Sequence, residues 1–154
     1  MVSDTVENAF SVFAVDVDGD GDTDILSANL ADSKIAWYEN DGNENFTEHL
    51  ISNSARSANS VYSADVDGDG DMDVLSSSAD DDKIAWYEND GNESFTAHTI
   101  STTANGANTV YASDVDSDGD IDVLSSSMLD NKIVWYENDG NESFTTHTLS
   151  SNEN

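Results

Sequence analysis

The stretch Asp16–Asp24, DVDGDGDTD, places five aspartates in nine residues, and the pattern returns at 65–73 (DVDGDGDMD) and 114–122 (DVDSDGDID). At neutral pH, carboxylates this close repel one another and raise one another's pKa. The spacing is the same in each copy, with aspartate at positions 1, 3, 5, 7 and 9 and glycine at position 6. A bound cation removes the repulsion, whereas a solvated acidic turn does not need a repeated register. The three loops therefore predict three cation sites.

The aspartate loops belong to a repeat of 49 residues that covers nearly the whole chain. The tryptophans and histidines recur with the same period: Trp37, Trp86 and Trp135, and His49, His98 and His147. Units of 40–50 residues with several strands each are typical of β-propeller blades. We expect an all-β fold built from four-stranded antiparallel blades, three per chain. The expected boundaries are a lead-in at 1–10 and blades at 11–59, 60–108 and 109–154.

Each repeat unit divides into four expected strands. In the second unit they are SVYSADV (60–66), MDVLSSSA (72–79), KIAWYEN (83–89) and SFTAHTIS (94–101). Asp90-Gly91, between the last two, is a strong hairpin signal because the turn needs positive φ. Alternate residues of KIAWYEN face opposite ways and both sets are apolar, as in a sheet covered on both faces. A two-layer sandwich ranks second, since it would show a cleaner alternation.

Calcium fits the aspartate loops better than magnesium. Ca²⁺ takes several oxygen ligands at about 2.4 Å, whereas Mg²⁺ prefers strict octahedral geometry and retained waters. Position 12 is serine rather than the glutamate of an EF-hand, so the aspartate at position 9 is expected to complete the ligand shell, and position 7 to offer its backbone carbonyl. We expect one Ca²⁺ per blade, three per chain. The predicted metal-binding residues are Asp16, Asp18, Asp20, Asp22, Asp24, Asp65, Asp67, Asp69, Asp71, Asp73, Asp114, Asp116, Asp118, Asp120 and Asp122.

The motif D-x-D-x-D-G-x-x-D between two strands, followed by WYENDGN and FT, resembles the FG-GAP/VCBS-type repeat of integrin α-subunit propellers and bacterial surface proteins. The resemblance extends over nearly the whole chain and implies calcium-bearing propeller blades in an extracellular or cell-surface protein. The Phe-Gly and Gly-Ala-Pro signatures are absent, so integrin-like ligand recognition is not implied. The first ten residues, MVSDTVENAF, lack the pattern of a signal peptide.

The charge of the chain excludes two classes of partner. Its 154 residues include 33 acidic and 4 basic ones, a formal net charge of −29. Nucleic acid and anionic membrane surfaces both require Lys and Arg, so neither is expected as a partner. The sequence has no apolar run long enough for membrane insertion. Lys34, Lys83 and Lys132 precede the third strand of each unit and are expected to offset nearby aspartates.

Three blades are too few for a closed propeller, which typically has four to eight. Each end of the chain is expected to expose a large apolar face, built from residues such as Ile35, Trp37, Ile133 and Trp135. Because the units are alike, blade 3 of one chain can dock on blade 1 of another. We expect a homodimer that forms a six-bladed ring, ahead of a trimer with nine blades. The alternative is that the chain is part of a longer propeller.

The leading functional hypothesis is a non-enzymatic binding or adhesion module that presents loops to a glycan or protein ligand. The expected ligand sites are the end opposite the aspartate loops, where the connections differ between blades, and the central channel. The alternatives are a purely structural self-assembling propeller fragment or engineered repeat protein, and a glycan-active hydrolase or lyase. Acid–base catalysis needs carboxylates in different environments, whereas these aspartates recur identically.

The recurring aromatic and histidine residues are expected to be structural. The tryptophans are assigned to the core between blades rather than to sugar stacking, and the histidines to the surface of the outermost strands. The three glycosylation sequons, at 45–47, 92–94 and 141–143, follow from the composition of the repeated turns.

Overall fold

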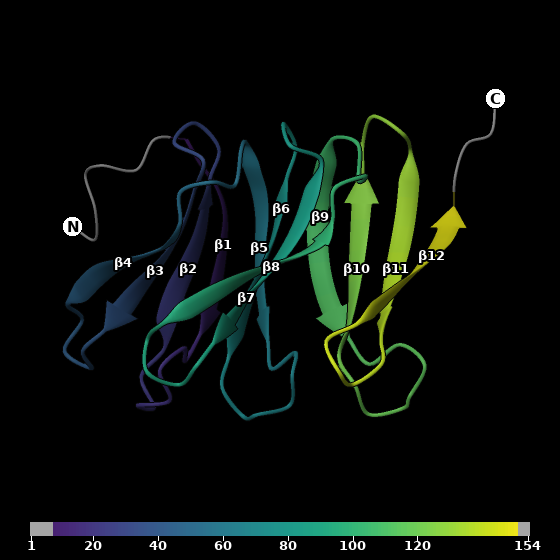
Figure 1. Cartoon of the computed structure of the whole chain (residues 1–154). Coiled ribbons are helices and arrows are strands. Elements are labelled where there is room, and N and C mark those ends of the chain that lie inside the picture. Colours follow the sequence, from purple (N-terminus) through teal and green to yellow (C-terminus); the bar gives the residue numbers. More distant parts are fainter. Residues whose placement is uncertain (1–7, 151–154) are drawn as a thin grey trace.

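The computed structural model describes residues 8–150, which form twelve strands in three antiparallel four-stranded sheets (Figure 1). The first sheet contains β1 (Ala9–Val15), β2 (Asp24–Asn29), β3 (Lys34–Asn40) and β4 (Phe46–Ser52). The second contains β5 (Ala58–Ala64), β6 (Asp73–Ser78), β7 (Lys83–Asn89) and β8 (Phe95–Ser101). The third contains β9 (Ala107–Ser113), β10 (Asp122–Ser127), β11 (Lys132–Asn138) and β12 (Phe144–Ser150). Within each sheet the strands follow one another in sequence order.

The observed strands agree with the all-β, four-strand unit expected from the sequence. The first strand begins at Ala9, two residues before the expected start of blade 1, and most of the expected lead-in lies outside the described residues. Residues 8–150 contain no helix, and so none that could cross a membrane. The chain therefore consists of three copies of one antiparallel unit.

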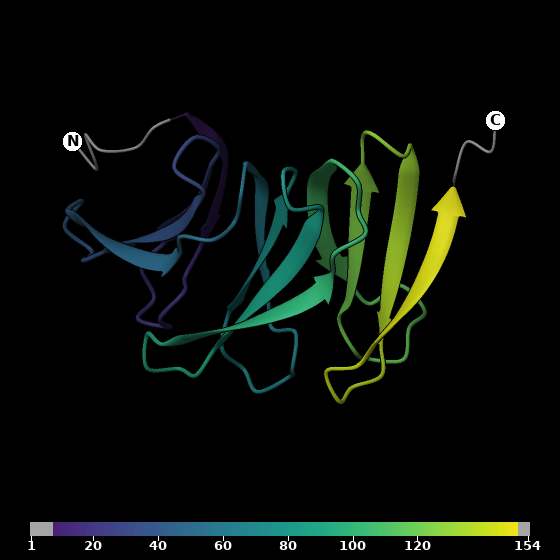
Figure 2. The ribbon, with the colours of Figure 1, turned by 45° about the horizontal axis from the view of Figure 1, so that its top comes forward.

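The three sheets stand side by side, with β1, β5 and β9 next to one another along the inner edge (Figures 1 and 2). The same repeat position supplies an aromatic ring to each inner strand. The ring centroids of Phe13 and Tyr62 are 4.6 Å apart, and those of Tyr62 and Tyr111 are 4.5 Å apart. A hydrogen bond to Tyr111 raises the pKa of Tyr62 to about 12. This row of aromatic rings joins the inner strands of all three sheets.

Two apolar cores of nearly the same composition fill the junctions between neighbouring sheets. Trp37, at the first junction, and Trp86, at the second, are fully buried, which confirms the predicted core role for these two tryptophans. The first core contains Val17, Leu26, Ala28, Ile35, Trp37, Ala55, Ala58, Val61, Val74, Ala85 and Tyr87. The second contains Val66, Leu75, Ile84, Trp86, Ala104, Ala107, Val110, Ala112, Val123, Val134 and Tyr136. Burying one large apolar side chain contributes about 1.5–3 kcal/mol, so each junction is a substantial source of stability.

One expectation about the open ends is wrong. Ile35 and Trp37 were assigned to an exposed end face, but both are fully buried between the first two sheets. The reason is that a given repeat position faces the same way in every sheet, so this face is covered in all sheets except the last. There, Ile133 is exposed and Trp135 is half-buried, as expected.

Candidate metal centres

Each aspartate loop is curled by hydrogen bonds from its own backbone to its carboxylates. In the loop between β1 and β2, Asp16 accepts from the amides of Gly19 at 2.9 Å and Gly21 at 3.0 Å. Asp18 and Asp20 each accept from the amide two residues later, at 3.1 and 2.8 Å. The same bonds recur in the second and third loops. Gly21 has φ of 96° with open space around the position of a Cβ, so the left-handed backbone is what requires glycine at position 6.

The aspartate at position 9 ties the loop to the end of the third strand. Asp24 is fully buried, and its carboxylate accepts from the amide of Val17 at 2.9 Å and that of Asn40, in β3, at 2.8 Å. Asp73 and Asp122 accept the same pair of bonds in their blades. Burial raises the pKa of Asp73 to about 6, although these hydrogen bonds oppose the shift. The buried carboxylate is therefore costly to ionise unless a positive charge lies beside it.

Positions 1, 3 and 9 of each loop come together in space. In each loop one carboxylate oxygen from every member of the set lies within 4.8 Å of the others. The three sets are Asp16, Asp18 and Asp24; Asp65, Asp67 and Asp73; and Asp114, Asp116 and Asp122. Burial, followed by the neighbouring carboxylates, raises the pKa of Asp18 and of Asp67. Nine of the fifteen predicted ligands are thus gathered into three equivalent groups.

The aspartates at positions 5 and 7 lie outside these three-residue groups. Asp20 accepts the amide of Asp22 at 2.8 Å, and its charge contributes to the raised pKa of Asp18. The carboxylate of Asp22 instead lies under the turn between β3 and β4, where a Cβ on Gly42 would collide with it. Asp71 and Asp120 occupy the same place in the other blades, and Asp69 and Asp118 correspond to Asp20. Because the carboxylate at position 7 lies away from the three-residue group, this position is better suited to offer its backbone carbonyl. The metal-binding role of positions 5 and 7 stays a prediction.

The donor set of each group fits a hard divalent cation such as Ca²⁺. All the candidate ligand atoms are oxygens, which Ca²⁺ prefers, and three carboxylates exceed the charge of one divalent ion. The lysines do not supply the balancing charge, because Lys34 pairs with Glu48, Lys83 with Asp81 and Lys132 with Asp130. These lysines offset acidic residues outside the loops. A cation in each group would compensate the repulsion that the loop geometry creates.

Asparagine side chains join the first and second aspartate loops to the following blade, a contact that the sequence did not reveal. Asn89, the last residue of β7, donates from Nδ2 to the carbonyl of Val17 in the first loop at 3.1 Å. Asn138 donates in the same way to Val66 in the second loop at 3.0 Å. The asparagine recurs with the repeat, in WYEN, so the sequence marks it as a constant position of the unit. Its partner could not be inferred, because it lies 72 residues away.

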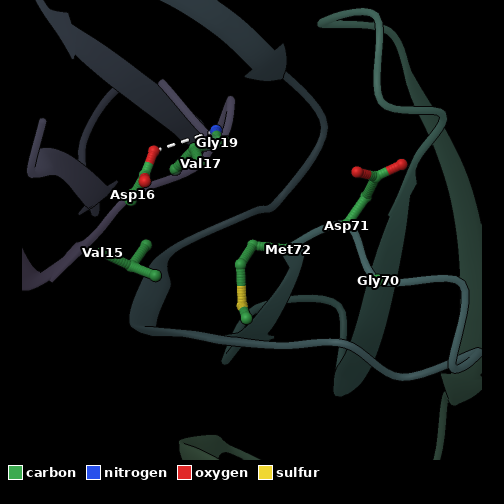
Figure 3. A pocket seen from close by; sticks show the side chains of 7 residues that line it. All are labelled: Val15, Asp16, Val17, Gly19, Gly70, Asp71 and Met72. Atoms are coloured by element: carbon green, nitrogen blue, oxygen red, sulfur yellow. Dashed lines mark hydrogen bonds between the residues drawn. The ribbon is translucent and has the colours of Figure 1, made fainter. Parts of the chain in front are cut away.

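A cavity of about 270 Å³ lies between the first and second aspartate loops (Figure 3). It is lined from the first blade by Val15, Asp16, Val17 and Gly19, and from the second by Gly70, Asp71 and Met72. Asp16 belongs to a candidate metal group, so a molecule in this cavity would lie beside that group. The cavity combines apolar walls with a few polar groups, as small-molecule sites commonly do.

The histidines of the outer strands are part of an ordered arrangement rather than isolated surface residues. His49 stacks on Trp37 with ring centroids 4.4 Å apart, and its Nε2 lies 2.7 Å from Glu39 Oε2. The other two blades repeat both contacts. Cross-strand register explains them, because His49 lies opposite Trp37 in the β3–β4 pair.

Comparison with known proteins identifies a sequence family and a structural neighbour. The family model described as the FG-GAP-like repeat matches residues 16–76 and 65–125. No curated protein sequence matches the chain. The solved structure of an Agrocybe aegerita lectin, described as the basis of specific recognition of non-reducing terminal N-acetylglucosamine, has a TM-score of 0.64 at 17% identity. The match covers 92% of this chain and 39% of the lectin, and it supports the assignment of the three sheets as β-propeller blades.

Proposed function

Because the chain belongs to the FG-GAP-like repeat family, we propose that it is a calcium-stabilised β-propeller module that binds a glycan or protein ligand without catalysing a reaction. The observation that carries the proposal is the identical grouping of three carboxylates in all three blades. In the first blade Asp16, Asp18 and Asp24 would hold the ion, joined by Asp20 and the carbonyl of Asp22. The ion would neutralise the loop and, through Asp24, join it to β3.

Thermal unfolding with and without calcium tests this role. A ligand present at about 100 times its Kd stabilises the folded state by about 2.7 kcal/mol per site. Each kcal/mol corresponds to roughly 2–8 °C in Tm for domains of this size range. Metal-free protein in excess EDTA should therefore melt many degrees lower than the calcium-loaded protein, and calcium should restore Tm where magnesium does not. Equal melting curves would contradict the role of calcium.

The ligand proposal rests on the cavity between the first two aspartate loops and on the lectin-like architecture. It therefore moves the candidate site from the opposite end, which the sequence favoured, to the end that carries the aspartate loops. A calcium ion held by Asp16 would border the cavity, and sugar hydroxyls are suitable neighbours for such an ion because it prefers oxygen ligands. A glycan array, probed with calcium-loaded protein, tests the glycan version. Selective binding that EDTA abolishes supports it, and an array without any bound glycan would leave a protein ligand as the surviving version.

The same aspartates argue against the alternative of a glycan hydrolase or lyase. Acid–base catalysis depends on two carboxylates whose pKa values are driven apart, whereas each blade presents the same set of three. A site affinity of order 10⁻⁴–10⁻³ M, typical of extracellular calcium modules, would suit an extracellular or cell-surface location. A purely structural propeller fragment remains the second candidate, and it predicts calcium binding without any glycan or protein ligand.

We also propose that a second copy of the chain completes the ring. On the open face of the third blade, Val115 is 43% exposed, Ile133 49% and Leu149 57%. The corresponding residues of the first two blades are buried or partly buried at the junctions. On the opposite open face, Val12 is 68% exposed, whereas Val61 is 4% exposed. Exposed apolar faces of this kind favour association.

The two open faces match because they repeat the two faces that meet at each internal junction. Asn89 and Asn138 each donate to the preceding blade, so Asn40 of one copy would donate to the carbonyl of Val115 in another. Two chains would give six blades, within the usual range for propellers, whereas three would give nine. The internal junctions thus support the proposed contact, and the usual size of propellers favours two chains.

Light scattering and native mass spectrometry test the ring. The wild-type chain should be a dimer, and Ile133→Asp should make it a folded monomer because a carboxylate would lie in the apolar junction. Leu50→Thr is the matched control, since Leu50 is an exposed outer-strand residue whose equivalents are Thr99 and Thr148. A well-folded wild-type monomer at high concentration would contradict the proposal.

A further inference from the structure

A second kind of polar cluster lies at the junction between the second and third blades. It consists of Glu88 in β7, His98 in β8 and Glu142 in the turn between β11 and β12. One carboxylate oxygen from each glutamate and one ring nitrogen of the histidine lie within 4.8 Å of one another. Among residues 8–150 it is the one such group that contains a histidine.

The imidazole of His98 is held in position by its neighbours on the same sheet. It stacks on the buried Trp86 with ring centroids 4.5 Å apart and an interplanar angle of 25°. Its Nε2 lies 2.7 Å from Glu88 Oε2, so the ring edge is directed toward the carboxylate. Two of the three ligand groups are therefore ordered together, which reduces the conformational entropy lost when an ion binds.

The third group comes from the next blade and makes the cluster electrostatically unbalanced. Glu142 lies in the turn between β11 and β12, where it has the same left-handed backbone as its equivalents Glu44 and Glu93. Its carboxylate approaches Glu88, so two negative charges share one imidazole, which can carry at most one positive charge. In a chain with a formal net charge of −29 this proximity is unfavourable without a cation.

We propose that Glu88, His98 and Glu142 bind a divalent transition-metal ion of the Zn²⁺ type, which links the second blade to the third. One imidazole nitrogen and two carboxylates are ligands that Zn²⁺ accepts, with water at the remaining position. Calcium favours all-oxygen sites, so the cluster differs in kind from the aspartate loops. The site goes beyond the proposed calcium-dependent module and does not depend on it.

The other two blades provide matched controls within the same chain. His49 and His147 have the same stacked tryptophan and the same glutamate partner, at 2.7 and 2.5 Å. Among the described residues, however, neither pair has a third ligand within the same range. A histidine–glutamate pair alone would bind zinc weakly at the surface, so the proposal predicts a difference between blades that are otherwise alike.

Isothermal titration with Zn²⁺, in calcium excess so that the aspartate loops are occupied, tests the site on the full chain. The wild-type protein should bind one tight equivalent per chain. His98→Gln and Glu142→Gln should each weaken that binding about tenfold or more, by analogy with the loss on mutating metal-supporting residues. His49→Gln and Glu93→Gln, the equivalent changes one blade earlier, should leave it unchanged.

The Glu142→Gln variant keeps the test decisive, because Glu142 is exposed and its replacement leaves the Trp86–His98 stack intact. Circular dichroism should show an unchanged fold for this variant. Absence of saturable zinc binding in the wild-type chain, or equal losses in His49→Gln and His98→Gln, would overturn the proposal. Neither result would bear on calcium binding, which is measured separately.

Discussion

The blades are held together by two regions of opposite character, the apolar junctions and the acidic loop edge. The junctions bury two nearly identical sets of apolar side chains and need no ion to be stable. The loop edge gathers three carboxylates per blade, each set including one fully buried aspartate. Burial favours the first arrangement and opposes the second unless a cation is bound. The difference indicates that the junctions define the fold, whereas under the proposed function the loops would make its stability depend on calcium.

The largest expected effect comes from emptying a junction. Trp86→Ala removes a fully buried ring between the second and third blades, and such changes cost about 3–5 kcal/mol. Urea unfolding in calcium measures the loss. The matched change is Trp135→Ala, at the half-buried equivalent position on the open face. Its cost should be smaller and should rise with protein concentration if a second copy covers it. Equal, concentration-independent losses would contradict the contrast between closed and open faces.

Removing one charge from an aspartate loop should lower the free energy of unfolding only when calcium is present, unlike a change in an apolar junction. In Asp67→Asn the side-chain oxygen still accepts the amide of Asp69, but one ligand charge is lost. In calcium the variant should lose up to about 2.7 kcal/mol, the contribution of one site at about 100 times Kd. In EDTA it should be as stable as the wild-type protein or slightly more so, because the raised pKa of Asp67 reflects a disfavoured charge.

Asp90→Asn is the control for that experiment. Asp90 lies in the turn between β7 and β8 and accepts the amide of Asn92, outside the metal groups. Its effect on unfolding should be the same with calcium and with EDTA. A calcium-independent effect of Asp67→Asn would remove the distinction between the loop and the turn.

The smallest expected effect comes from the asparagine hydrogen bond that links one blade to the aspartate loop of its neighbour. Asn89→Ala removes the hydrogen bond to Val17 in the neighbouring loop, which should cost about 1 kcal/mol, together with the bond to Met72 in its own blade. Asn40→Ala, in the first blade, should cost less in monomeric protein, because the side chain of Asn40 donates to Thr23 of its own blade. Comparing the two variants in an association-defective background measures the inter-blade part alone. Identical costs would show that the contact with Val17 contributes nothing.

The fold was largely predictable because its determinants are local and repeated. The 49-residue period, the Asp-Gly turn and the apolar character of both faces of KIAWYEN were enough to place four strands in each unit. The sequence did not show which face of the first sheet and which face of the last sheet are left uncovered. Ile35 and Ile133 occupy the same repeat position, and only the order of the blades in space makes one buried and the other exposed.

The sequence predicted ligands at positions 1, 3, 5, 7 and 9 of each loop, and the structure gathers positions 1, 3 and 9. This part was predictable because the spacing of ligands in a curled loop is encoded by neighbouring residues. Contacts across blades were missed, since they depend on partners about one or two units away in the sequence. Asn89 reaches Val17 in this way, and Glu142 approaches His98 across the second junction. The stacking of His98 on Trp86 was also missed, although it follows from the pairing of β7 with β8.

The central claim is that the recurring aspartate groups hold calcium, one ion per blade. Native mass spectrometry of metal-free protein, titrated with calcium, counts the ions on each chain directly. We expect three ions per chain at saturation, falling to two in Asp67→Asn. A chain that retains no calcium at millimolar concentrations, or that retains three ions in the variant, would contradict the account.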